Sequence, residues 1–145
     1  MQTRLNFFQT NPAAMRALKS LDTQLAASTL EPALQELVRL RASQLNGCAF
    51  CMDVHSADAR RAGIDERRLA LLPAWREAPL YSPRERAALA WAEDLTLVAD
   101  SHAPDASWQL VREQFQDAEL VDLTLLVTTI NAWNRFAVAF RKLPA

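Results

Sequence analysis

Apolar residues recur along most of this chain at the three-to-four-residue spacing of amphipathic helices. The segment from about residue 31 to residue 45 shows this best, with one apolar stripe that contains Leu30, Leu34, Leu37, Val38 and Leu45. No run of four or more residues alternates apolar and polar positions in the way that a half-buried strand does. The pattern therefore predicts an all-α protein.

Helix caps divide this pattern into about seven helices. A capping box from Ser82 to Glu85 begins one of them, and Asp117 caps the last. Gly47 and Gly63 end two others, because glycine readily takes the left-handed conformation that follows a helix. The predicted helices span about residues 12–27, 31–45, 48–62, 66–72, 83–101, 106–116 and 117–140. We expect one compact domain, with an N-terminal arm and helix over residues 1–29 and a core over residues 30–145.

Composition narrows the classes of function. Only 2 of the 145 residues are glycine, whereas about 7% is usual. A dinucleotide-binding fingerprint needs three glycines and a phosphate-binding P-loop needs two in close register, so both are excluded. The 16 basic and 17 acidic residues give a net charge of -1. Because no basic stripe stands out, we expect neither nucleic acid nor a membrane surface as a partner.

The chain shows neither the apolar segment of a secretory signal near its start nor a stretch of the ~18–20 apolar residues that span a bilayer. We therefore expect a cytoplasmic protein. In that compartment a pair of cysteines is more often catalytic or metal-binding than structural.

Both cysteines and one of the two histidines fall within residues 48–55. On a helix, Cys48, Cys51 and His55 occupy positions i, i+3 and i+7, which share one face. A helix N-terminus lowers the pKa of a cysteine, and His55 follows Cys51 by four residues, close enough to hold or take the thiol proton. Helical cysteines three positions apart have Cα atoms about 5 Å apart, which suits a disulfide. These residues predict a thiol pair that cycles between dithiol and disulfide.

Glu36 lies on the preceding predicted helix. A carboxylate brought near His55 or Cys51 could orient the imidazole or pass a proton. The alternative is an ion pair with Arg39, three residues along the same helix.

Three polar residues interrupt the apolar last helix at positions i, i+3 and i+4: Asn131, Asn134 and Arg135. Buried polar groups require hydrogen-bond partners. These residues predict a hydrogen-bond network that joins helices or subunits, with a substrate contact as the alternative.

Other interpretations of the cysteine pair remain open. Cys48, Cys51, His55 and His102 could supply four zinc ligands, although a structural zinc site usually has a second tight ligand pair. A thioredoxin-type site is disfavoured because no strand precedes the cysteines. The pair could also be two buried cysteines without a reaction, and His102, in a polar turn, could simply be solvated.

Glu36, then Cys48-Ala49-Phe50-Cys51 and His55, resemble the E…CxxCxxxH pattern of the alkylhydroperoxidase D (AhpD)-like branch of the carboxymuconolactone decarboxylase family. The glutamate precedes the first cysteine by twelve positions, as in that pattern. The segments 44–48 and 130–135 also resemble short members of the family, and the resemblance covers about residues 30–140.

The resemblance implies an all-α protein that assembles into homotrimers or homohexamers. It also implies a thiol-dependent peroxidase that reduces small hydroperoxides, needs no metal or other cofactor, and is regenerated by an external dithiol or redox protein. By resemblance, Cys51 is the peroxidatic thiol, Cys48 resolves its sulfenic acid, and His55 and Glu36 form the proton relay.

One departure from the pattern is Phe50, which stands where the peroxidase that names the branch has a second histidine. The alternatives are a general disulfide oxidoreductase, a decarboxylase-like enzyme, and a non-catalytic binding module stabilised by zinc. The cysteine pair itself argues against the decarboxylase, because the true decarboxylases of the family do not depend on one.

Overall fold

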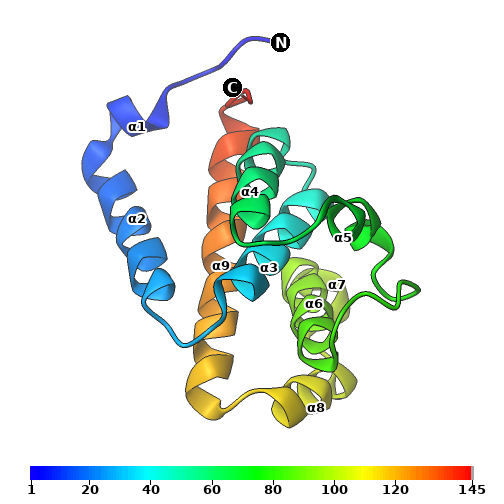
Figure 1. The fold of residues 1–145 in the computed structure, drawn as a ribbon. Coiled ribbons are helices and arrows are strands. Elements are labelled where there is room, and N and C mark those ends of the chain that lie inside the picture. The colour runs from blue at the N-terminus through cyan, green and yellow to red at the C-terminus, as the bar shows by residue number, and fades with distance from the viewer. Residues whose placement is uncertain (145) are drawn as a thin grey trace.

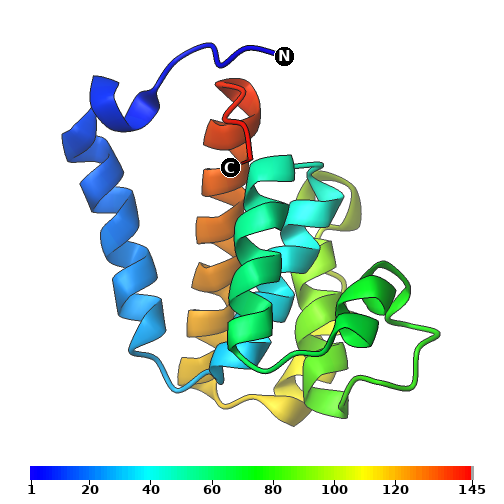
Figure 2. The same cartoon turned by 45° about the horizontal axis from the view of Figure 1, so that its top comes forward.

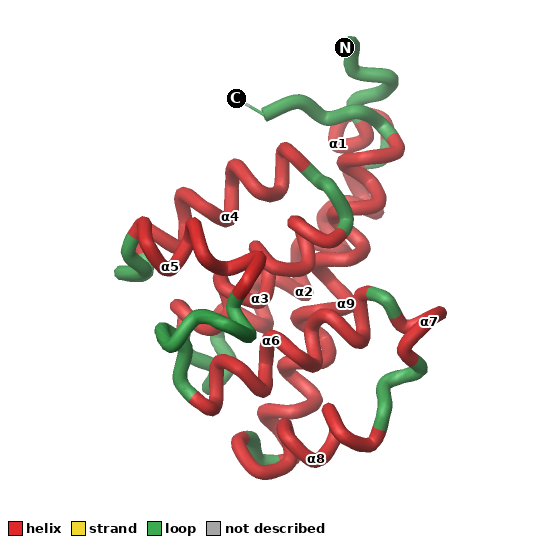
Figure 3. Tube along the Cα trace, turned by 90° about the vertical axis from the view of Figure 1, so that its right-hand side faces the viewer, coloured by secondary structure: helices red, strands yellow, loops and turns green. Residues whose placement is uncertain are grey.

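Helices account for all the regular structure in residues 1–144, which are the residues that the computed structural model describes (Figure 3). The expected all-α class is confirmed. In chain order the elements are α1 (Phe7–Thr10), α2 (Pro12–Ala26), α3 (Pro32–Leu45), α4 (Ala49–Arg61), α5 (Glu66–Leu71), the 3-10 helix η1 (Leu72–Ala74), α6 (Pro83–Thr96), α7 (Val98–Ser101), α8 (Asp105–Gln114) and α9 (Asp117–Ala139).

The expected number of about seven helices is too low, since the described residues form nine α-helices. The two additional ones, α1 and α7, have only four residues each. Residues 7–10 are not among the predicted helices, because four residues contain too few turns to show a repeating apolar face. Residues 98–101 are predicted to continue the helix that begins at residue 83, but the backbone of Leu97, with ψ of 34°, ends α6 and makes α7 a separate helix. The expected cap of the last helix is also wrong. Gln116 is the N-cap of α9, its N–H donates to Glu119 Oε2 at 2.9 Å, and Asp117 is the first helical residue.

The helix α9 is the central element, with α2 on one side and α3, α4 and α6 on the other (Figure 1). Val38, Ala88 and Leu123 are fully buried in the core that α3, α6 and α9 share. A second core lies beneath α4, α5 and η1, where Leu37 and Leu72 are fully buried. Although α9 has 23 residues, no helix within residues 1–144 is long and apolar enough to cross a membrane.

The N-terminal helices fold back along the C-terminal half of α9 (Figure 2). Phe7 is buried, and the ring of Phe8 stacks on Trp133 with 5.8 Å between centroids. The Arg4 N–H donates to the Phe140 carbonyl at 2.9 Å. These contacts bring the first residues of the chain beside the end of α9, close to the start of α4.

Candidate functional site

The junction between α3 and α4 places both cysteines. Gly47, with φ of +63°, ends α3 in a Schellman motif, in which the Cys48 N–H donates to the Ser43 carbonyl at 3.0 Å. Cys48 is at the same time the N-cap of α4, and its Sγ accepts a 3.3 Å hydrogen bond from the Cys51 N–H. Cys48 thus makes the closing hydrogen bond of the motif that ends α3 and also caps α4, so the sulfurs lie at the start of α4.

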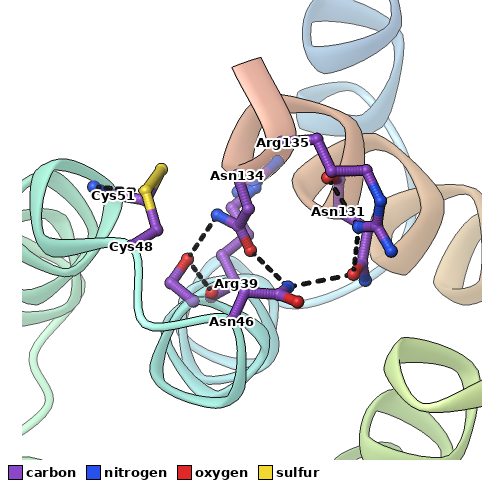
Figure 4. The surroundings of a disulfide bond; sticks show 8 residues. Arg39, Asn46, Cys48, Cys51, Asn131, Asn134 and Arg135 are labelled. Carbon is purple, nitrogen blue, oxygen red and sulfur yellow. Dashed lines mark hydrogen bonds between the residues drawn. A yellow bond between two sulfur atoms is a disulfide. The ribbon is translucent and has the colours of Figure 1, made fainter. Parts of the chain in front are cut away.

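The two sulfur atoms are joined in a disulfide, drawn in yellow in Figure 4, and the Cα atoms are 5.3 Å apart. This separation agrees with the predicted helical spacing. Cys48 is 1% exposed and Cys51 is 4% exposed. The hydrogen bond from the first turn of α4 reaches Cys48 rather than Cys51. In the reduced protein this donor and the helix dipole would favour the Cys48 thiolate.

Glu36 contacts both partners that the sequence offered it. Its Oε2 lies 2.8 Å from His55 Nδ1, and its Oε1 accepts a 2.6 Å hydrogen bond from Arg39. The ion pair and the contact with His55 therefore occur together. Because a carboxylate can only accept, Nδ1 carries the proton in this pair. The other ring nitrogen, Nε2, is then the one that can take or give a proton.

The charge of Glu36 is fixed by these neighbours. Burial raises the pKa of the Glu36 carboxyl, but the hydrogen bonds and positive charges of His55 and Arg39 outweigh burial, so the pKa lies below its ordinary value. At neutral pH the side chain is an ionised carboxylate that orients the imidazole.

Cys51 and His55 line a pocket of about 250 Å³ between α4 and the helices α1, α2 and α9. We call this the aromatic pocket, because four of the residues that line it are aromatic: Phe7, Phe8, Phe50 and Trp133. Asp22 on α2 also lines it, and its carboxylate accepts a 2.8 Å hydrogen bond from the Trp133 indole N–H. The arrangement offers an apolar group a binding site beside a reactive sulfur.

Sequence reasoning missed the part of this pocket that the N-terminal helices supply. Phe7 and Phe8 stand in a segment expected to be an arm, and Asp22 lies in the predicted first helix without a chemical role. The adjacent aromatic residues were the available signal, because two neighbouring large rings in an otherwise polar arm are usually buried against something.

The predicted polar network joins helices, as Figure 4 shows. The Asn46 side chain donates to Asn131 Oδ1 at 3.0 Å and to Asn134 Oδ1 at 2.8 Å. Asn134 in turn donates to Ser43 Oγ at 3.0 Å, and Arg135 donates to Asn131 Oδ1 at 2.9 Å. The network fastens the end of α3 to α9, immediately before the disulfide.

The zinc alternative needs two thiolates together with His55 and His102. The two sulfurs are bonded to each other, and His102 is an exposed residue at the C-terminal end of α7. In the described part of the chain, the possible ligand atoms that lie within 4.8 Å of one another belong to Glu36, His55 and Asp58. That group contains neither a cysteine nor His102, so it is not the ligand set of the zinc alternative.

Comparison with known proteins agrees with this geometry. Residues 12–94 match the family model of the carboxymuconolactone decarboxylase family. The chain is 38% identical over 139 residues to the uncharacterized protein YdfG of Bacillus subtilis (strain 168), which covers 96% of this chain and 95% of YdfG.

The fold of this chain is also similar to that of solved structures. A protein of unknown function from Agrobacterium tumefaciens, described under the name AhpD as an antioxidant defence protein, has a TM-score of 0.97 at 40% identity over 99% of both chains. An uncharacterized peroxidase-related protein from Silicibacter sp. TM1040 has a TM-score of 0.82 at 25% identity, covering 93% of this chain and 72% of that one.

Proposed function

The chain belongs to the carboxymuconolactone decarboxylase family, in its AhpD-like branch, and we propose that it is a thiol-dependent peroxidase that reduces organic hydroperoxides. One observation carries the proposal. Cys51, bonded to Cys48, shares an apolar pocket with His55, and Glu36 holds that imidazole at 2.8 Å.

The oxidising step follows from this arrangement. With the pair reduced, His55 Nε2 takes the proton of the Cys51 thiol, and the thiolate attacks the terminal oxygen of the hydroperoxide. The O–O bond breaks, the sulfur becomes a sulfenic acid, and the alkoxide leaves as an alcohol with the proton returned by His55. Glu36 stabilises the imidazolium that exists between these two proton transfers.

Cys48 then closes the disulfide. Its thiolate, favoured by the Cys51 N–H and the start of α4, attacks the Cys51 sulfur. The S–O bond breaks, and the hydroxide takes a proton and leaves as water. An external dithiol or redox protein in the cytoplasm returns the disulfide to the dithiol.

The lining of the aromatic pocket indicates the class of peroxide. Four aromatic residues line the same pocket as Cys51. Burial of an apolar group against them contributes about 25 cal/mol for each Å² removed from water. An organic hydroperoxide gains this free energy, whereas hydrogen peroxide has no apolar group to bury.

We also propose that the protein assembles as a homotrimer or homohexamer. A groove of about 730 Å³ between α8 and α9 supports this, because apolar side chains make much of its wall. Trp108 is 44% exposed there and Val121 is 67% exposed. Exposed apolar surface of this kind is typical of contacts between subunits.

The two cysteines give different outcomes in the test of the peroxidase. With cumene hydroperoxide and excess dithiothreitol, Cys51→Ser should lose turnover, because the attacking sulfur is gone. Cys48→Ser should keep the first step, and its Cys51 sulfenic acid should be trapped by dimedone and identified by mass spectrometry. Asp53→Asn, at an exposed position on α4 two residues after Cys51, is the matched control and should turn over normally. Wild-type turnover by Cys51→Ser would refute the proposal.

A further inference from the structure

The two sulfurs of the disulfide line different pockets. Cys51 lines the aromatic pocket, whereas Cys48 lines a second one of about 400 Å³, which we call the Cys48 pocket. Phe50 and Ala137 line both and so form the partition between them. The wall of the Cys48 pocket comes from residues 1 and 4, the turn at residues 47–50, and residues 137–144 at the end of α9 and beyond. The disulfide therefore connects two separate approaches.

The Cys48 pocket is positively charged. Arg4, Arg141 and Lys142 line it, and no acidic side chain does so among the described residues. None of the three forms an ion pair within residues 1–144, whereas eight arginines elsewhere in the structure do. Lys142 Nζ lies 4.6 Å from the centre of the Phe50 ring. Within the described residues, three cations that form no ion pair thus line the pocket beside one sulfur.

Arg141 occupies a backbone position that usually belongs to glycine. It follows the C-cap of α9 with φ of 51°, and its N–H donates to the Val138 carbonyl at 3.2 Å. The next N–H, of Lys142, donates to the Ala137 carbonyl at 2.9 Å, which completes a Schellman motif. A side chain at this φ carries strain that glycine avoids. The chain nevertheless places a guanidinium here, beside the Cys48 pocket.

We propose that the Cys48 pocket is the entry site of the reductant and that it selects a small dithiol carrying a negative charge. The inference rests on the proposed redox cycle, because it assigns the step that regenerates the thiols. A thiolate attacks a disulfide sulfur along the axis of the S–S bond. An attack on Cys48 must therefore come from the side away from Cys51, and the Cys48 pocket is lined by Cys48 and not by Cys51.

The exchange takes two steps. One thiolate of the reductant bonds to Cys48 Sγ, the Cys48–Cys51 bond breaks, and Cys51 leaves as a thiolate. The second reductant thiol loses its proton and attacks the reductant sulfur that is bonded to Cys48. Cys48 then leaves as a thiolate, stabilised by the Cys51 N–H, and the reductant departs as a cyclic disulfide. Two electrons pass to the protein, and the two thiol protons of the reductant protonate the two cysteines.

Dihydrolipoate and its amide, dihydrolipoamide, are suitable probes because they share one dithiol and differ by one negative charge. Oxidised full-length protein is mixed with each, and loss of the disulfide is followed by stopped flow without peroxide. The acid should reduce the protein about tenfold faster than the amide at low ionic strength. Added salt should shrink this preference, because it screens the cations.

Variants of the pocket distinguish the effect of removing positive charge from the effect of poor folding. Arg141→Gln combined with Lys142→Gln should remove the preference for the acid, so that acid and amide reduce this variant at the same rate. Arg141→Gly should weaken the preference too. Because glycine suits the positive φ at this position, this variant should fold and can test the effect of charge even if the double variant folds poorly. Arg141→Lys should retain the preference. Arg67→Gln, on α5 and lining neither pocket, is the matched control and should behave as wild type.

Equal rates with acid and amide in the wild type would overturn the inference. A preference that survives the double variant would overturn it as well. Because reduction is measured without a hydroperoxide, these outcomes are independent of peroxide turnover. A protein that fails as a peroxidase can still show or lack the charge preference, so the two failures are distinguishable.

Discussion

The two carboxylate oxygens of Glu36 bind residues on two different helices. One oxygen binds His55 on α4 and the other binds Arg39, and the side chain is 12% exposed. Both contacts favour the ionised carboxylate over the protonated acid, which is why the pKa is lowered in spite of burial. The contact between Glu36 and His55 therefore contributes to stability and also orients the imidazole for proton transfer.

This coupling predicts how stability depends on pH. The lowered pKa means that the Glu36 carboxylate stabilises the fold above its unfolded pKa, near 4.5, and that this contribution is lost as pH falls through the lower folded pKa. Glu36→Gln should cost about 2 kcal/mol at pH 7, as expected for hydrogen bonds to a charged group. The difference from wild type should shrink as the pH falls from 4.5 through the lower folded pKa.

Urea unfolding at neutral and acid pH measures this difference. Glu77→Gln is the control, since Glu77 is exposed and forms no ion pair within the described chain. A deficit in Glu36→Gln that stays constant across the pH range would contradict the assignment.

Among the helices, the turn from α3 into α4 determines where the sulfurs lie. Gly47 and Gly63 both end helices with positive φ, of +63° and +88°. A Cβ added at either position would meet no atom within 4 Å, so alanine there costs only backbone strain. The two glycines are a matched pair, because only Gly47 adjoins the disulfide.

Alanine at either glycine should lower the free energy of unfolding by about 1 kcal/mol. Only Gly47→Ala should also change the reduction potential of the cysteine pair, because it alters the turn that makes Cys48 the N-cap of α4. Thermal unfolding and equilibration with glutathione buffers give the two quantities. Equal shifts of potential in both variants would show that the turn does not set the redox properties.

The packing of the helices in the whole molecule explains how the N-terminal segment contributes to the site. α1 and α2 cover α9 and complete the aromatic pocket, so they contribute to a site whose reactive groups all lie elsewhere. The groove between α8 and α9 is instead left uncovered by the single chain, and Val121 is 67% exposed there. Covering that groove with a second copy would bury apolar surface that a single chain leaves in water.

Val121→Asp should therefore yield folded single chains, whereas the wild type should sediment as a trimer or hexamer. The carboxylate would be buried without a partner in the assembly, which is costly. Leu71→Asp on α5, 37% exposed, is the matched control and should leave the assembly intact. A wild-type protein that sediments as one chain would contradict the proposed assembly.

Short-range features were predictable from the sequence alone. The all-α class, the Schellman end at Gly47 and the capping box at Ser82 depend on residues within five positions of one another. The spacing of Cys48 and Cys51 belongs to the same class, since helical geometry alone brings them into disulfide range. Such contacts follow from local backbone conformation, which the nearby residues determine.

Only the tertiary structure decided which groups surround the disulfide. Glu36 and His55 are 19 residues apart and meet because α3 packs on α4. Trp133 reaches the aromatic pocket from α9, and Phe8 reaches it from a helix too short for a periodic signal. That Cys48 faces a cationic pocket rests on Arg141, at the far end of the sequence. These contacts depend on how whole helices pack, and helix packing is set by the combined burial of many side chains rather than by any local motif.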